Sequence, residues 1–75
     1  MAVTAKAVHN LADKIRELKE TLEGMKDAKQ EVLDNAENAD YPNEEKIEGL
    51  QTQVDILEEA FDSLESAVDG LENYE

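Results

Sequence analysis

The segment 34–45, DNAENADYPNEE, carries the residues best spaced for metal chemistry. Numbered from its first residue as a calcium loop, it has oxygen-bearing side chains at the first, fifth, seventh and twelfth places, which are Asp34, Asn38, Asp40 and Glu45. Such a loop also needs a ligand at its third place and a turn glycine at its sixth. Ala36 and Ala39 occupy those places, so we expect no specific calcium site, and we expect no cofactor elsewhere in the chain.

The sequence contains few of the residues and motifs that catalysis usually requires. His9 is the only histidine and there is no cysteine, which removes thiolate nucleophiles, thiolate metal sites and disulfides. The chain also lacks a glycine-rich phosphate loop, an HExxH motif and a Ser-His-Asp set. We expect His9 to be an exposed surface residue and the protein not to be an enzyme.

The charge is strongly negative and unevenly distributed. Twenty Asp and Glu against seven Lys and Arg give a net charge of −13. Most of the imbalance lies in residues 30–75, where Lys46 is the only base among fifteen acids. Phosphate backbones and anionic membrane surfaces would repel such a chain. We therefore expect no direct nucleic-acid or membrane binding, and a basic protein surface, such as one that binds nucleic acid, as a candidate partner.

A row of carboxylates is predicted along one side of a helix in the second half. Its candidate partner-binding members are Asp55, Glu58, Asp62, Glu65 and Asp69, and Glu72 continues the row. Steps of three and four residues put helical neighbours ~5–6 Å apart, comparable to the phosphate spacing along a nucleic-acid strand. Three interpretations stay open: imitation of nucleic acid in a basic cleft, docking on another basic protein, or a solvated face that keeps the protein soluble.

Two helices must position these residues, because apolar residues recur in heptads in both halves. The first half has Val8, Leu11, Ile15, Leu18, Leu22, Met25, Val32, Ala36 and Ala39, with Lys29 in the one missing place. The second half has Ile47, Leu50, Val54, Leu57, Phe61, Leu64, Val68 and Leu71. Such seams are typical of antiparallel helix pairs and coiled coils.

Turn chemistry separates the two seams. Pro42 lacks a backbone donor and pushes Tyr41 out of helical geometry, and Asn43 is a good N-cap. Thr4 or Asn10 can cap the first helix. We predict one domain over residues 1–75, an all-α antiparallel two-helix hairpin with a helix at about 5–38, a turn at 39–43 and a helix at about 44–72.

One antiparallel register pairs the two seams throughout. It predicts these contacts: Ile15 with Leu71, Leu18 with Val68, Leu22 with Leu64, Met25 with Phe61, Val32 with Val54, Ala39 with Ile47, and Lys29 with Leu57. The same register brings Lys19 near Glu65 and Lys26 near Glu58 on the flank. Lys29 would lay its stem on Leu57 with its ammonium in water, or act as a polar residue that fixes register or oligomeric state.

A second, uncharged strip runs along the second helix. Its members are Gln53, Ile56, Ala60, Ser63, Ala67, Gly70 and Tyr74, and Thr21, Gly24 and Ala28 continue it on the first helix. Small residues at helical spacing allow another helix to approach closely. The strip is either an ordinary surface or a docking seam, where two hairpins form a homodimeric four-helix bundle or one hairpin receives a partner's helix.

The stretch LEEAFDSLESAVDGLENYE, after a turn with Asn, Pro and Glu, resembles a group of small acidic helical proteins of Firmicutes, their phages and their mobile elements. Members of that group often end in LEEA-ID-LEEA-like repeats, and the resemblance covers the second half of this chain. It implies a phage or mobile-element origin and assigns no functional residues. Small acidic phage proteins include inhibitors of host defence nucleases.

Together these features predict a non-catalytic, cytoplasmic interaction protein, in the host cell if a phage encodes it. It would bind a host protein as a small inhibitor or accessory factor and form a homodimer. Two alternatives stay open: a nucleic-acid mimic of the anti-defence or anti-CRISPR type that uses the acidic row, and a structural bundle with no ligand.

Overall fold

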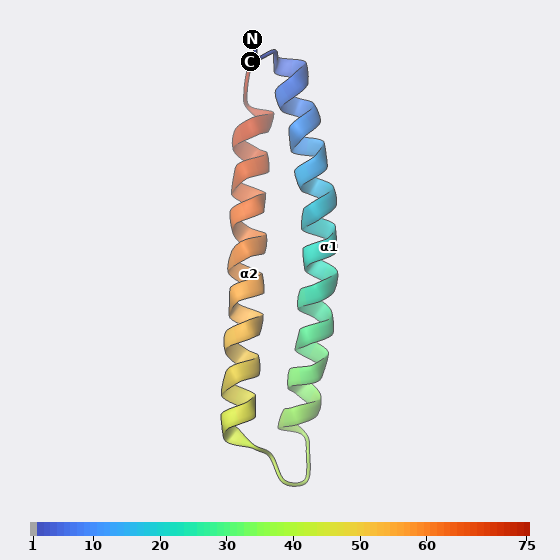
Figure 1. Cartoon of the computed structure of the whole chain (residues 1–75), viewed down its shortest axis with the longest axis vertical. Coiled ribbons are helices and arrows are strands. Elements are labelled where there is room, and N and C mark those ends of the chain that lie inside the picture. Colours follow the sequence, from blue (N-terminus) through green and yellow to red (C-terminus); the bar gives the residue numbers. More distant parts are fainter. Residues whose placement is uncertain (1) are drawn as a thin grey trace.

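The computed structural model describes residues 2–75 as two long antiparallel helices (Figure 1). Helix α1 spans Ala5–Glu37, helix α2 spans Glu44–Glu72, and residues 38–43 connect them. The predicted all-α hairpin is confirmed, and the observed ranges differ from the predicted ones by one residue at the end of α1. Residues 2–4 and 73–75 lie at the end of the hairpin opposite the connection (Figure 1).

Side-chain caps fix where each helix begins. The Thr4 hydroxyl accepts a hydrogen bond from the Ala7 N–H at 3.1 Å, and the Asn43 side chain accepts one from the Lys46 N–H at 3.1 Å. Each cap satisfies one of the backbone donors that a helix leaves unpaired in its first turn. Glu44 and Glu45 in the first turn of α2 also interact favourably with its N-terminal dipole.

The seam of α2 faces α1 as the sequence predicts. Every member of that seam is buried or half-buried: Ile47, Leu50, Val54, Leu57, Phe61, Leu64, Val68 and Leu71. The best-packed part lies next to the connection, where Leu33 of α1 packs with Leu50 and Val54, and Ala36 and Ile47 pack against them. Branched aliphatic side chains therefore close the hairpin at its turn.

The prediction for α1 is wrong in one of its two rows. Val8, Ile15, Leu22 and Ala36 face α2 as expected, but the second row that faces α2, here named the inner row, is Ala12, Lys19, Lys26 and Leu33. The predicted row, here named the outer row, is Leu11, Leu18, Met25 and Val32, and these side chains are 50, 61, 56 and 45 % exposed. Ala39 lies exposed in the connection.

The rotation of α1 has a physical reason. Three adjacent heptad rows of α1 carry apolar residues, and one facing helix can cover only two of them. Lys19 and Lys26 gain by turning inward, since their ammonium nitrogens lie 5.1 and 5.4 Å from the ring centroid of Phe61. Their stems cover apolar surface while the charges contact the ring face.

Several predicted contacts change with this rotation. Leu18, Met25 and Val32 are turned outward rather than packed on Val68, Phe61 and Val54. On the flank, the prediction for Lys19 is confirmed, since its nitrogen lies 3.9 Å from a Glu65 oxygen. Lys26 contacts Phe61 and makes no ion pair with Glu58 among residues 2–75.

The hairpin is long and thin. Its extents are 59 × 18 × 15 Å and its radius of gyration is 17.2 Å, compared with about 11 Å for a compact domain of this length. Between residues 2 and 75, neither helix contains an apolar segment that could span a bilayer. Most side chains consequently lie at the surface. The two broad sides of the hairpin differ in the polarity of their residues.

Candidate protein-interaction surface

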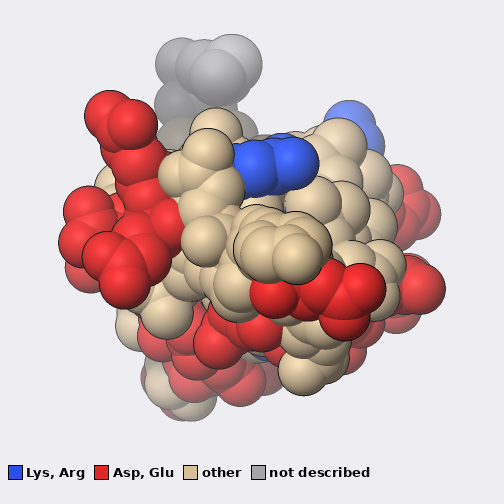
Figure 2. Space-filling view, turned by 90° about the horizontal axis from the view of Figure 1, so that it is seen from below, with Lys and Arg blue, Asp and Glu red and all other residues tan. Residues whose placement is uncertain are grey.

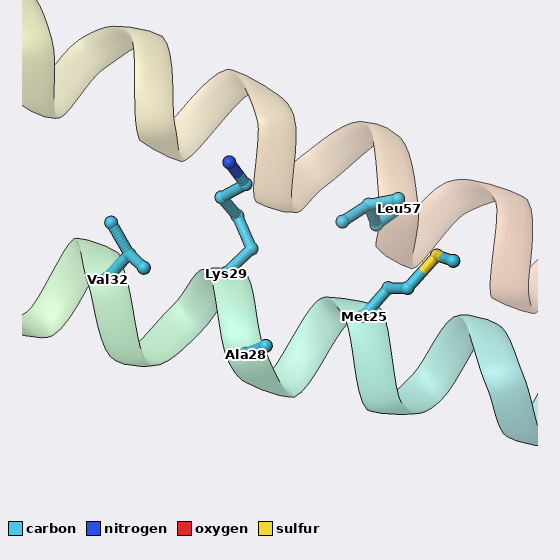
Figure 3. A pocket seen from close by; sticks show the side chains of 5 residues that line it. All are labelled: Met25, Ala28, Lys29, Val32 and Leu57. Carbon is cyan, nitrogen blue, oxygen red and sulfur yellow. The ribbon is translucent and has the colours of Figure 1, made fainter.

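An open apolar groove of about 440 Å³ marks one broad side of the hairpin (Figure 3). Met25, Ala28, Lys29 and Val32 of α1 line it together with Leu57 of α2. Met25 and Leu57 point toward each other, and the Lys29 side chain extends across toward α2 (Figure 3). The contact of Lys29 with the Leu57 region fits a stem that lies on apolar surface.

The opposite broad side is polar. A second groove of the same volume, about 440 Å³, opens there. Its lining is Gln30, Leu33, Glu37, Gln51, Val54, Asp55 and Glu58. The two grooves show that the outer row of α1 lies on one side of the seam, while the carboxylates Glu37, Asp55 and Glu58 lie on the other.

The side with the apolar groove contains no carboxylate along its helices. On α1 its rows are the outer row and the neighbouring Ala7, Lys14, Thr21, Ala28 and Asn35. On α2 they are Lys46, Gly49, Gln53, Ile56, Ala60, Ser63, Ala67 and Gly70. We name this surface the carboxylate-free face. All twenty acids of the chain fall elsewhere, and the charges on this side are Lys14, Lys46 and, in the groove, Lys29.

The end view shows the same division. Seen from the connection, Asp and Glu gather at the two flanks and along the lower edge, while the upper middle shows uncharged and basic residues (Figure 2). In a chain with a net charge of −13, a random arrangement would spread acids over every side. The hairpin instead separates them from one face.

The outer row gives the carboxylate-free face its apolar content. Ile56 of α2 adds to it at 58 % exposed. Monomeric soluble proteins seldom expose large contiguous apolar patches, and such patches mark binding surfaces. One signal in the sequence pointed to this row: apolar residues occur in three adjacent heptad rows of α1, and a single facing helix can cover only two rows.

The residues of the predicted uncharged strip mostly meet on this face. Gln53, Ile56, Ser63 and Ala67 are exposed, Ala60 is half-buried, and Thr21 and Ala28 join them from α1. Gly24 does not join them, because its heptad row contains Glu17 and Glu31 and points away from α2. A Cβ built on Gly24, Gly49 or Gly70 would meet nothing within 4 Å, so no contact inside the hairpin requires these glycines.

The acidic row divides into two groups. Glu65 pairs with Lys19 and Glu72 pairs with Arg16, whose guanidinium also contacts Asp13 at 2.6 Å. The remaining carboxylates Asp55, Glu58, Asp62 and Asp69 are exposed and have no ion pair within the described part of the chain. These four carboxylates of the row are left available to a basic partner.

His9 has a structural contact at the open end of the hairpin. Its Nε2 lies 3.1 Å from the Tyr74 carbonyl oxygen, and the Tyr74 hydroxyl donates to the Val3 carbonyl oxygen at 3.3 Å. Across residues 2–75, no three His, Asp or Glu side chains are placed to share a metal ion.

Comparison with known proteins adds no relative: no protein-family model, no curated protein and no solved structure matches this chain. The function is consequently inferred from the two surfaces of the hairpin.

Proposed function

We propose that this protein is a non-catalytic protein–protein interaction module that binds through its carboxylate-free face. The observation that carries the proposal is the outer row, four apolar side chains that are 45 to 61 % exposed on the one face without acids. Complete burial of such a side chain contributes about 1.5–3 kcal/mol. A partner that covers the exposed half of each gains roughly 1 kcal/mol per residue.

The chain would act as a small accessory or inhibitory protein on its partner. Two helices supply grooves lined by few residues, and their open form suits recognition rather than the enclosure of a small substrate. The resemblance of residues 57–75 to acidic helical proteins of Firmicutes phages and mobile elements supports a host protein as that partner.

A second candidate function uses the opposite surface. Asp55, Asp62 and Asp69 are exposed and unpaired within residues 2–75, and they repeat every seven residues along a straight helix. A basic nucleic-acid-binding cleft could accept such a row in place of phosphates. Binding of this kind weakens steeply as salt rises, whereas binding to the carboxylate-free face depends little on salt.

Affinity capture from a host lysate tests both candidates with matched variants. Leu18→Glu with Met25→Glu places two charges on the carboxylate-free face, and Ser66→Glu with Thr52→Glu adds the same charge on the outward side of α2. Asp55→Asn with Asp62→Asn and Asp69→Asn removes three of the four unpaired acids of the row.

We expect the Leu18/Met25 variant to lose the captured protein and both other variants to keep it. Circular dichroism should show unchanged helicity, because the two substituted side chains are 61 and 56 % exposed. Equal capture by the Leu18/Met25 variant and the wild-type chain would contradict the proposed face. If only the three Asp→Asn substitutions abolish capture, and high salt dissociates the wild-type complex, the result would favour the nucleic-acid mimic.

A further inference from the structure

The hairpin exposes more surface than a self-sufficient domain of its mass. Folded monomers follow a size relation that gives about 4,600 Å² for 8.4 kDa. This chain exposes 5719 Å², which is about 1,100 Å² more than that relation gives. A stable protein–protein interface covers about 800 Å² on each partner. The excess is thus large enough for one complete interface.

Charge decides which surface a second copy of the chain could cover. Two copies carry −13 each, and the sides outside the carboxylate-free face would place carboxylates against carboxylates. Buried like charges oppose association by several kcal/mol. The carboxylate-free face brings together only uncharged residues and three lysines, Lys14, Lys29 and Lys46, and no carboxylate. It is the surface on which identical copies can meet without this repulsion.

We propose that a second copy of this chain covers the carboxylate-free face and forms a homodimeric four-helix bundle. This inference rests on the proposed function and names the partner of the same face. The outer row then becomes the centre of the bundle, with Leu18 and Met25 near the middle of α1. The rotation that left these residues out of the hairpin core places them in the dimer core.

Side-chain size selects one orientation of the two copies. On this face α1 carries large residues, while α2 carries small ones at Ala60, Ser63, Ala67 and Gly70. Cores pack well when large side chains face small ones. A Cβ at Gly70 would meet nothing within 4 Å in the single hairpin, which leaves room for an approaching side chain. Helix α1 of one copy therefore lies over α2 of its partner.

Two-fold symmetry together with this pairing determines at which end of the bundle each connection lies. When α1 lies over the partner's α2, the symmetry axis runs along the bundle and both 38–43 connections lie at the same end. The other two-fold arrangement puts α1 over α1 and α2 over α2, with the connections at opposite ends. That arrangement would force large residues against large ones and small against small, at unequal helix spacings.

Sedimentation equilibrium at micromolar concentration tests the dimer. We expect twice the chain mass of 8.4 kDa for the wild-type chain and for the Ser66→Glu/Thr52→Glu control. Leu18→Glu/Met25→Glu should weaken association at least thirty-fold, about the effect of burying an unpaired charge in an interface. A monomeric wild-type chain, or a dimer unchanged by the Leu18/Met25 substitutions, would overturn the inference.

A spin label tests the orientation. The chain has no cysteine, so Asp40→Cys in the connection gives one label per copy. With both connections at one end, the labels should lie within about 20–30 Å, since packed helices are ~8–10 Å apart and the label arms add to this. Labels separated by nearly the 59 Å length of the hairpin would overturn the orientation.

The failure of this inference is distinguishable from failure of the proposed function. If the wild-type chain is monomeric while the Leu18/Met25 variant loses a different captured protein, the face binds a foreign partner and the homodimer is wrong. If the chain is monomeric and capture is also unchanged, the proposed function fails with it. A dimer that the Leu18/Met25 substitutions dissociate supports both.

Discussion

The inner and outer rows of α1 are neighbours in sequence and opposites in environment. Leu11, Leu18, Met25 and Val32 face outward, and the very next residues, Ala12, Lys19, Lys26 and Leu33, face α2. In three of the four pairs of neighbours the outward residue is the more hydrophobic one: Leu11 beside Ala12, Leu18 beside Lys19, and Met25 beside Lys26. A hairpin that folded only to bury its own apolar surface would make the opposite choice.

The difference teaches that α1 has more apolar surface than α2 can cover. The lysines of the inner row can serve the hairpin because their stems are apolar and Phe61 and Glu65 accept their charges. The outer row contains no charged group that could make such contacts, and its Met25 and Val32 only line the open groove together with Leu57 of α2. We interpret the inner row as the part of α1 that holds the hairpin together and the outer row as the part that serves association.

The largest expected contrast is between Leu33 and Val32. Leu33 is 4 % exposed in the core beside the connection, and Val32 is 45 % exposed. Leu33→Ala should lower the free energy of unfolding by about 2–4 kcal/mol, since it removes buried methyl groups and leaves a cavity. Val32→Ala should cost less than about 1 kcal/mol at concentrations where the chain is monomeric.

Chemical denaturation of both variants, followed by helicity at low concentration, measures this contrast. Equal losses of stability would show that Val32 is buried in the hairpin as well and would remove the distinction between the two rows.

The lysines of the inner row should show a smaller effect. In a double-mutant cycle, Phe61→Leu is combined with Lys19→Met and Lys26→Met, which keep the stems and remove the ammonium groups. We expect a coupling free energy of about 1–2 kcal/mol, from two cation–π contacts of ~0.5–1 kcal/mol each. The unfolding midpoints of the four proteins give this value. A coupling of zero would mean that the stems alone hold the lysines inward.

The smallest effect should come from the ion pair of Glu65. Glu65→Gln and Asp62→Asn each remove one negative charge from a crowded acidic side, but only Glu65 has a lysine 3.9 Å away. Glu65→Gln should leave the protein less stable than Asp62→Asn by about 0.5 kcal/mol, as for an exposed pair. Thermal unfolding at low salt should show the difference, and 1 M salt should erase it.

Much of the fold could be predicted because several signals coincided. Pro42 and Asn43 determine where one helix ends and the next begins, and α2 has only one apolar seam. The α1 seam was assigned wrongly because periodicity favours the outer row, which is wholly apolar, over the inner row, which contains two lysines. The correct choice depends on how Lys19 and Lys26 contact Phe61, and that geometry is known only once the helices are packed.

The α2 half of the candidate surface could be predicted from the sequence, but the α1 half could not. The uncharged strip of α2, with Ile56 and Ala67, is visible in the sequence because it lacks charge where acids are frequent. The outer row could not be assigned to it while Leu18 and Met25 were placed in the hairpin core. Correcting the rotation of α1 joins the two strips into one face.

The position of the core cluster also has a kinetic consequence. Leu33 and Leu50 close a short loop across the connection, whereas the hydrogen bond between Tyr74 and Val3 spans 71 residues. Two doublings of loop length raise the entropic cost of closure by about 1.2 kcal/mol. We expect folding to start at the connection and to proceed like a zipper toward the chain ends, so that amide hydrogen exchange is slowest around Leu50 and fastest near the termini.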